Sequence, residues 1–230
     1  MPTNDADMPA AVVYLYHEGK TELGYVQSLA KERAIRIVPM PSVSSPVRLL
    51  ECAMRFAANN AEDLRDNPNA EIWVVFDHDA KAKEMAAVRS ALAKCPPECI
   101  VGCRVRDVNK CAEKDILGRI HVALMSPCIE VWGLLCTEEG LVMKRIPVDR
   151  HELQSLLHKV MPRYSHNKGA QFDVHKMVRT QEATLRAKEW AKTHGSFLEC
   201  LNAPHYAGIY PLVEKIMASP EVQFDSWRRR

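Results

Sequence analysis

The sequence lacks an excess of charge of either sign. It has 31 Lys and Arg residues against 29 Asp and Glu residues, a formal net charge of +2. This balance excludes a histone-like basic binder and an acidic-tail protein. The charges are nevertheless segregated: residues 1–79 carry 7 basic and 12 acidic residues, whereas residues 144–192 carry 11 basic and 5 acidic. Such a division suits a carboxylate-rich cation site and a separate surface for a polyanion, with solvated helix faces as the alternative.

Long apolar runs are also missing. No stretch approaches the roughly 18 apolar residues that a membrane-spanning helix needs. The first ten residues are polar and acidic rather than a basic segment followed by an apolar one, so the sequence contains no secretory signal pattern. The sequence therefore predicts a cytoplasmic protein without membrane association.

Cysteines are too few for a disulfide scaffold, with eight in 230 residues. The cluster Cys95, Cys99, Cys103 and Cys111 lacks the two-residue spacing of a zinc knuckle. Between residues 99 and 105, cysteines and valines alternate with other residues, which is typical of one face of a strand. Buried thiols are therefore favoured over a metal site.

Short apolar runs alternate with amphipathic segments along the first part of the chain. Strands are expected at residues 12–16, 35–39, 72–76, 99–105 and 121–125. Helices are expected at residues 21–33, 46 to about 67, 81–94 and 127–136, and then, with no confident strand, at 149–161, 173–194 and 206–218. This order predicts an α/β, Rossmann-like fold with a mostly parallel sheet over residues 1–140 and a helical extension over residues 141–230 packed on it. Catalytic groups of such folds gather at the carboxyl ends of the strands.

The first expected strand ends at a glutamate corner. The Gly19-Lys20-Thr21 triplet looks like part of a phosphate-binding P-loop, but the second glycine of that motif is absent, because Tyr14 stands at its position. Glu18 lies where the strand gives way to the helix, and Glu22 lies in the first helical turn, where the helix dipole favours a carboxylate. A solvated glutamate at a strand–helix corner is the alternative.

The third expected strand ends in a pair of aspartates, Asp77 and Asp79. Side chains two residues apart on a strand point the same way, so the two carboxylates lie close together. Like charges at this distance repel unless a cation lies between them, and Mg²⁺ prefers oxygen ligands. Together with Glu18 on another strand of the same sheet, this pair predicts a metal site.

Four segments carry a resemblance to a known family. They are Glu18-Gly19-Lys20-Thr21-Glu22, Trp73-Val74-Val75-Phe76-Asp77-His78-Asp79, Ser126-Pro127-Cys128-Ile129-Glu130-Val131-Trp132-Gly133-Leu134-Leu135, and Asn202-Ala203-Pro204-His205-Tyr206-Ala207-Gly208-Ile209-Tyr210-Pro211-Leu212-Val213. In this order they resemble the RloB-like branch of the Toprim superfamily, over residues 12–213. The sequence departs from the family pattern in lacking an Asn between Ser126 and Pro127, in having Ile129 where an aromatic residue is usual, and in a stretched Tyr164 to Lys168 pair.

The resemblance implies a Toprim-like fold and metal-dependent cleavage of phosphodiester bonds. Glu18 would act as a general acid or base or as a metal ligand, and Asp77 and Asp79 would bind Mg²⁺, or Mn²⁺ in its place. Glu130 would have a catalytic role, with a surface carboxylate as the alternative. Glu22 and His78 would lie just outside the metal ligands. For Glu22, a second metal ion and a simple helix-terminal charge are alternatives.

The basic second part of the chain would then bind nucleic acid. The expected contacts are Lys159, Arg163, Tyr164, His166, Lys168, Lys176 and Arg179, with Tyr164 as a stacking face and His166 as a hydrogen-bond donor. Solvated helix charges are the alternative for each.

Relatives suggest a biological setting. They lie in anti-phage defence loci beside an ABC-type or AAA-type ATPase, and the related effector of the PARIS system is a Toprim tRNA nuclease held inactive by its ATPase partner. The resemblance therefore implies a defence nuclease, with RNA, tRNA included, preferred over DNA. A non-catalytic nucleic-acid-binding or partner-binding module is the alternative, and the oligomeric state, a homo-oligomer included, stays open.

Overall fold

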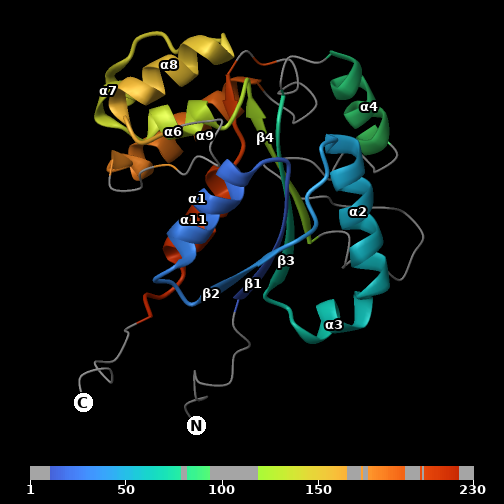
Figure 1. Cartoon of the computed structure of the whole chain (residues 1–230). Coiled ribbons are helices and arrows are strands. Elements are labelled where there is room, and N and C mark those ends of the chain that lie inside the picture. The colour runs from blue at the N-terminus through green and yellow to red at the C-terminus, as the bar shows by residue number, and fades with distance from the viewer. Residues whose placement is uncertain are drawn as a thin grey trace, which may run out of the picture.

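A mostly parallel sheet forms the centre of the molecule (Figure 1). The computed structural model describes residues 11–78, 82–93, 119–164, 172, 176–194, 203 and 205–222. The strand order is β2-β1-β3-β4-β5, in which β1 (Ala11–His17), β2 (Ile35–Pro39), β3 (Ala70–Asp77) and β4 (Ile120–Ser126) are parallel. The short edge strand β5 (Tyr206–Ala207) is antiparallel to β4. The predicted α/β class with a mostly parallel sheet is confirmed.

Helices cover both faces of the sheet. On one face lie α1 (Lys20–Ala30) and α11 (Tyr210–Ala218), and on the other lie α2 (Pro46–Asn59), α3 (Ala61–Asp66) and α4 (Ala82–Ala93) (Figure 1). A further group, α6 (Glu130–Leu135), α7 (Glu138–Val142), α8 (Arg150–Val160) and α9 (Thr180–His194), gathers beyond the end of β4. None of the described helices has the length and apolarity needed to cross a membrane.

Two apolar clusters, one on each face of the sheet, form the core. Alternate residues of β3 divide between them: Trp73 and Val75 belong to the first, and Ile72, Val74 and Phe76 to the second. This division explains why β3 is a continuous apolar run, because both of its faces are covered.

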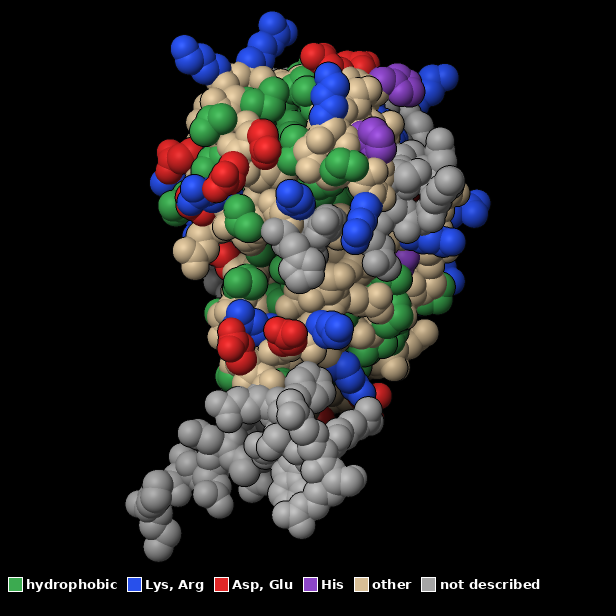
Figure 2. Space-filling model, turned by 60° about the vertical axis from the view of Figure 1, so that its left-hand side comes forward, with side chains coloured by type: hydrophobic (Ala, Val, Ile, Leu, Met, Phe, Trp, Pro, Cys, Tyr) green, Lys and Arg blue, Asp and Glu red, His purple; other side chains and the backbone are tan. Residues whose placement is uncertain are grey.

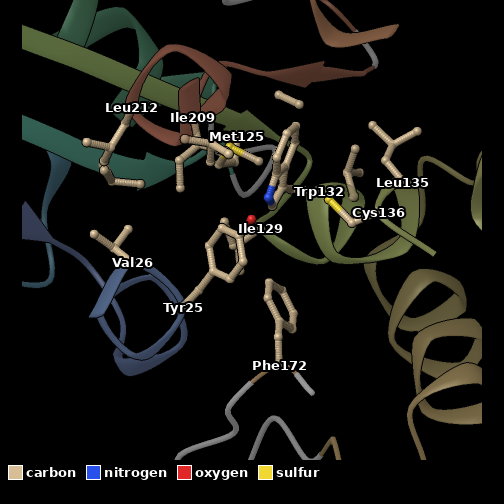
Figure 3. Close-up of a cluster of buried hydrophobic side chains, with 14 of the residues drawn as sticks. Tyr25, Val26, Met125, Ile129, Trp132, Leu135, Cys136, Phe172, Ile209 and Leu212 are labelled. Carbon is tan, nitrogen blue, oxygen red and sulfur yellow. The ribbon is translucent and has the colours of Figure 1, made fainter. Parts of the chain in front are cut away.

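The first cluster joins segments that are far apart in the sequence. Figure 3 shows Tyr25 and Val26 of α1 facing Trp132 of α6 and Leu212 of α11. Residues from both predicted parts of the chain therefore share one core. The predicted boundary at residue 140 stays a prediction.

The structure corrects two of the expected helices. Residues 206–218 were expected to form one helix, but Tyr206 and Ala207 pair with Ser126 and Met125 as β5, and α11 begins only at Tyr210. The helix expected from residue 46 to about 67 is divided at Asn60 into α2 and α3. The strand expected at residues 99–105, with the cysteine cluster around it, lies outside the described residues.

Candidate active site

The carboxyl ends of three neighbouring strands, β1, β3 and β4, meet at one edge of the sheet. The register pairs His17 with Val75 and Asp77 with Met125. The backbone N–H of Glu18 donates to the carbonyl of Val75 at 3.3 Å, and the N–H of His78 donates to the carbonyl of Met125 at 2.7 Å. The glutamate corner and the aspartate corner therefore lie on adjacent strands, and β4 leads directly into the segment that carries Glu130.

Asp77 is held between two other elements at this edge. Its side chain is buried, with 6% of the residue exposed. Carboxylate Oδ1 accepts a hydrogen bond of 2.9 Å from the backbone N–H of Ile129, just before α6. Carboxylate Oδ2 lies 3.8 Å from Nη2 of Arg150, the first residue of α8. Asp77 thus contacts the start of α6 and the start of α8 together.

Glu22 points back over the corner at Gly19. A Cβ atom at Gly19 would lie 2.6 Å from Oε2 of Glu22, so any larger residue at position 19 would have to displace the end of the glutamate side chain. Glu22 is 3% exposed, and Oε2 has no hydrogen-bond partner among the described residues. Burial raises the pKa of Glu22 to about 7; the negative charges of Glu130 and Glu18 act in the same direction, against a backbone hydrogen bond and the charge of Arg150. The helix-terminal charge that is one alternative for Glu22 is therefore a buried carboxyl group whose pKa lies near neutral pH.

Glu130 is completely buried in the first turn of α6. Its Oε1 accepts a hydrogen bond of 2.6 Å from the hydroxyl of Tyr164 and one of 3.1 Å from the amide of Gln154. Burial alone would raise the pKa of Glu130, but hydrogen bonds from Cys128, Tyr164, the backbone and Gln154 together lower it. The surface alternative for Glu130 is wrong, because none of the residue is exposed. The negative charge of Glu130 instead helps to raise the pKa of Glu22.

Two histidines flank these corners. The Nδ1 atom of buried His17 is 2.7 Å from the carbonyl oxygen of Gly19, so this nitrogen donates and fixes the turn that carries Glu18. Burial lowers the pKa of His17, and the same hydrogen bond opposes the shift. His78 contributes its backbone N–H to the aspartate corner, and its side chain is half-buried. Both histidines therefore support the backbone at the strand ends.

The oxygen donors at this edge suit a hard divalent cation. Glu18, Asp77 and the buried Oε2 of Glu22 are carboxylate donors of the kind that Mg²⁺ accepts. Within the described residues, however, no group of three or more His, Cys, Asp and Glu side chains is arranged to hold a metal ion. Asp79, the second aspartate of the predicted pair, lies outside these residues. The predicted Mg²⁺ site stays a prediction.

The sequence motifs that line this edge lie within a family match. The family model for RloB-like proteins matches residues 13–216, which is most of the chain and includes β2, β3, β4, β5 and all of β1 except its first two residues. The chain belongs to the RloB-like family. No curated protein and no solved structure matches it. Within this RloB-like chain, the glutamate corner, the aspartate corner and the segment that contains Glu130 are the parts that the fold brings together.

The residues expected to bind nucleic acid lie in different surroundings. Lys159, Arg163 and Lys176 are exposed, whereas Arg179 pairs with Glu138 at 3.3 Å and Glu182 at 3.0 Å. Figure 2 shows Lys, Arg and His side chains around the upper part of the molecule, where α7 and α8 lie. His166 and Lys168 lie outside the described residues.

Tyr164 does not offer the stacking face that was expected of it. It is 2% exposed, and its ring packs against that of Phe172 with centroids 5.5 Å apart. Its hydroxyl donates a hydrogen bond to Glu130. The prediction of a stacking contact at Tyr164 is wrong, because the aromatic ring belongs to the core that holds the site.

Arg150 and Gln154 are the site residues that the sequence interpretation missed. Both lie on the first two turns of α8, one close to Asp77 and the other bonded to Glu130. The available signal was the helix start itself, where the side chain of Asp149 accepts a hydrogen bond from the N–H of Glu152. That signal places a helix at residue 150 but does not tell which strand it approaches.

Proposed function

We propose that this RloB-like protein is a metal-dependent endonuclease that cleaves phosphodiester bonds of nucleic acid, with RNA preferred over DNA. The observation that carries the proposal is the convergence of Glu18, Glu22, Asp77 and Glu130, with Arg150 among them, at the carboxyl edge of a parallel sheet. Ligand and catalytic groups of open α/β sheets lie at this edge. The resemblance of the four sequence motifs to those of Toprim nucleases supports the same assignment.

The burial and the contacts of each residue indicate its role. Asp77 and Glu18, with Asp79, would hold Mg²⁺ or Mn²⁺, which when bound would polarise a phosphoryl oxygen and stabilise charge on the leaving oxygen. Glu22 titrates close to neutral pH, which is the condition for a group that both accepts and gives up a proton during catalysis. Glu130 is enclosed by protein, so it acts through its neighbours as a positioning residue.

The exposed cations support a nucleic-acid substrate. Lys159 lies in the last turn of α8, the helix whose first residue reaches Asp77, and Arg163 lies three residues beyond its end. A nucleic acid whose scissile phosphate lies at the carboxylates would extend its neighbouring phosphates along α8 toward them. By analogy with relatives, we also propose that the protein is an anti-phage effector restrained by an ABC-type or AAA-type ATPase.

A second function is favoured by one observation. Since both carboxylate oxygens of Asp77 already have protein partners, the N–H of Ile129 and the guanidinium of Arg150, the same edge suits a non-catalytic module that binds nucleic acid or a partner protein. The buried Glu22 and the ion pair between Arg150 and Asp77 would then be structural.

One assay separates the two functions. Purified protein is incubated with labelled tRNA and with plasmid, in Mg²⁺ or Mn²⁺, beside the variants Glu18→Ala and Asp77→Ala. Glu51→Ala is the matched control, because Glu51 is an exposed carboxylate on α2, which covers the face of the sheet opposite to α1. Cleavage that both site variants lose and the control keeps supports the nuclease. Binding without cleavage in either metal contradicts it and supports the module.

A further inference from the structure

We propose that Ser42 is a positioning residue of this site, and that its hydroxyl fixes the direction in which Glu18 points. The inference rests on the proposed function and extends it, since Ser42 lies outside the four sequence motifs. The hydroxyl of Ser42 donates to the carbonyl oxygen of His17 at 3.0 Å and to that of Glu18 at 3.2 Å. One side chain from the loop after β2 thus contacts both peptide groups that flank Glu18.

The sequence around the end of β2 explains why a side chain makes this contact. In a parallel pair, every second N–H of a strand faces the neighbouring strand. The N–H of Met40 donates to β1 at 2.9 Å, and Ser42 is the next position in this phase. Pro39 and Pro41 lie at the positions between, where an N–H would face away from β1, so they cost the edge strand β2 no ladder hydrogen bond. The hydroxyl of Ser42 thus takes the place of the next ladder donor at His17.

The two peptide groups determine where Glu18 points. Because each peptide group is planar and rigid, their orientations set the direction of the Cα–Cβ bond of Glu18. The preceding group is held at both ends: the carbonyl of His17 accepts from Ser42, and the N–H of Glu18 donates to the carbonyl of Val75 at 3.3 Å. The following group is held by Ser42 through the carbonyl of Glu18. Ser42 therefore takes part in fixing both groups.

His17 holds the next carbonyl along the corner. Its Nδ1 atom donates to the carbonyl oxygen of Gly19 at 2.7 Å. Ser42 and His17 thus bind three successive carbonyls, those of residues 17, 18 and 19. Of these, the two that belong to the peptide groups of Glu18 are the ones that Ser42 binds.

The exposure of Ser42 separates this role from a contribution to stability. Ser42 is an exposed residue, and its bond to the carbonyl of Glu18 lies at the surface. Water can hydrogen-bond to a carbonyl that loses an exposed donor, so removing the hydroxyl should change the stability of the fold little. A mobile water molecule does not hold a peptide group in one orientation, and a small displacement of a catalytic group lowers the reaction rate strongly.

A simple anchor for the loop is the competing explanation. In that case the hydroxyl fastens residues 40–45 to β1, and Glu18 keeps its orientation through the bond to Val75. Removal of the hydroxyl would then loosen the loop and leave cleavage unchanged. If Ser42 positions Glu18, its removal lowers the rate of the chemical step and leaves substrate binding in place, because the hydroxyl is engaged by the backbone.

The test uses the full chain and three variants: Ser42→Ala, Ser42→Thr, which keeps the hydroxyl, and Ser44→Ala as a control. Ser44 is an exposed serine of the same loop, and its side chain has no hydrogen-bond partner among the residues that the structure describes. The kcat and KM are measured for cleavage of a labelled tRNA in Mg²⁺. Amide hydrogen exchange of a peptide that spans residues 17–24 is measured by mass spectrometry without metal or RNA, and the unfolding midpoint Tm by circular dichroism.

For Ser42→Ala we expect kcat to fall by about tenfold or more and KM to stay within about twofold of the wild type, which is the pattern of lost orientation. Amide exchange in residues 17–24 should be about fivefold faster, the change that corresponds to one hydrogen bond. The Tm should fall by no more than about 2 °C. Ser42→Thr should restore both the rate and the exchange, and Ser44→Ala should match the wild type.

The outcomes bear on the two proposals separately. A kcat of Ser42→Ala equal to that of the wild type, or a loss that Ser42→Thr does not restore, overturns the positioning role and leaves the nuclease standing. Unchanged exchange in residues 17–24 overturns the positioning role as well, because the hydroxyl would then not hold the corner. A wild type that cleaves no nucleic acid in Mg²⁺ or Mn²⁺ overturns the nuclease, and faster exchange in Ser42→Ala would still support the hold of Ser42 on Glu18.

Discussion

Replacing Glu22 by glutamine should change how the stability of the protein depends on pH. In the folded protein the pKa of Glu22 is raised to about 7 from its ordinary value of 4.5, first by burial and then by Glu130 and Glu18. A carboxyl group with a raised pKa binds more protons in the folded state than in the unfolded state. Its effect on stability is therefore small below pH 4.5 and becomes increasingly unfavourable as the pH rises through 7.

The size of the effect follows from the shift. A difference of about 2.5 pKa units corresponds to about 3 kcal/mol at pH 8, where the folded protein must carry the buried charge, and to less than about 1 kcal/mol at pH 5. Glutamine has the same shape and cannot ionise, so Glu22→Gln should not lose this stability at high pH. For a chain of this length, 3 kcal/mol corresponds to a rise in Tm of about 5–10 °C at pH 8.

Thermal unfolding followed by circular dichroism between pH 5 and pH 8 measures this difference. The stability of Glu22→Gln should gain on the wild type as the pH rises, whereas Glu51→Gln on the exposed surface of α2 should follow the wild type throughout. The reasoning is refuted if wild type and Glu22→Gln show the same pH dependence, because Glu22 would then be ionised in the folded protein at no cost.

Two further substitutions test the hydrogen bonding and the helix packing around the site. Tyr164→Phe removes the 2.6 Å hydrogen bond to the charged Glu130 and should lower the free energy of unfolding by about 2 kcal/mol in urea titrations; an unchanged midpoint would show that the other hydrogen bonds of Glu130 hold it without Tyr164. Gly140→Ala would place a Cβ atom 1.9 Å from the backbone oxygen of Leu134, so it should cost about 3 kcal/mol or more. A Gly140→Ala protein that unfolds like the wild type would mean that α7 packs less closely on α6 than the structure has it.

The parallel strands and their polar ends could be predicted because their signals are local. A strand such as β3, buried on both faces, contains a continuous apolar run, and Asp77 is the last residue of the strand. The same rule for parallel sheets then places the ends of neighbouring strands together. Glu18 and Asp77 were found in this way without any knowledge of their distance.

The parts that were missed depend on tertiary contacts. The strand β5 has two residues, too few to show a period, and it is a strand only because β4 offers a free edge. The approach of Arg150 to Asp77 joins positions far apart in the chain, and nothing near residue 150 indicates it. Tyr164 lies in a polar stretch of sequence that indicates a surface position. In the structure its hydroxyl donates to Glu130 and its ring packs against Phe172, so the side chain belongs to the core.

The central claim is that phosphodiester cleavage takes place at the carboxyl edge of this sheet. The most direct test is the single-turnover rate of tRNA cleavage over a titration of Mg²⁺, for the wild type and for Asp77→Asn, which keeps the shape of the side chain and removes its charge. The account predicts metal-dependent cleavage by the wild type and a loss of about 100-fold or more in Asp77→Asn at every metal concentration. Equal rates for the two proteins would contradict it.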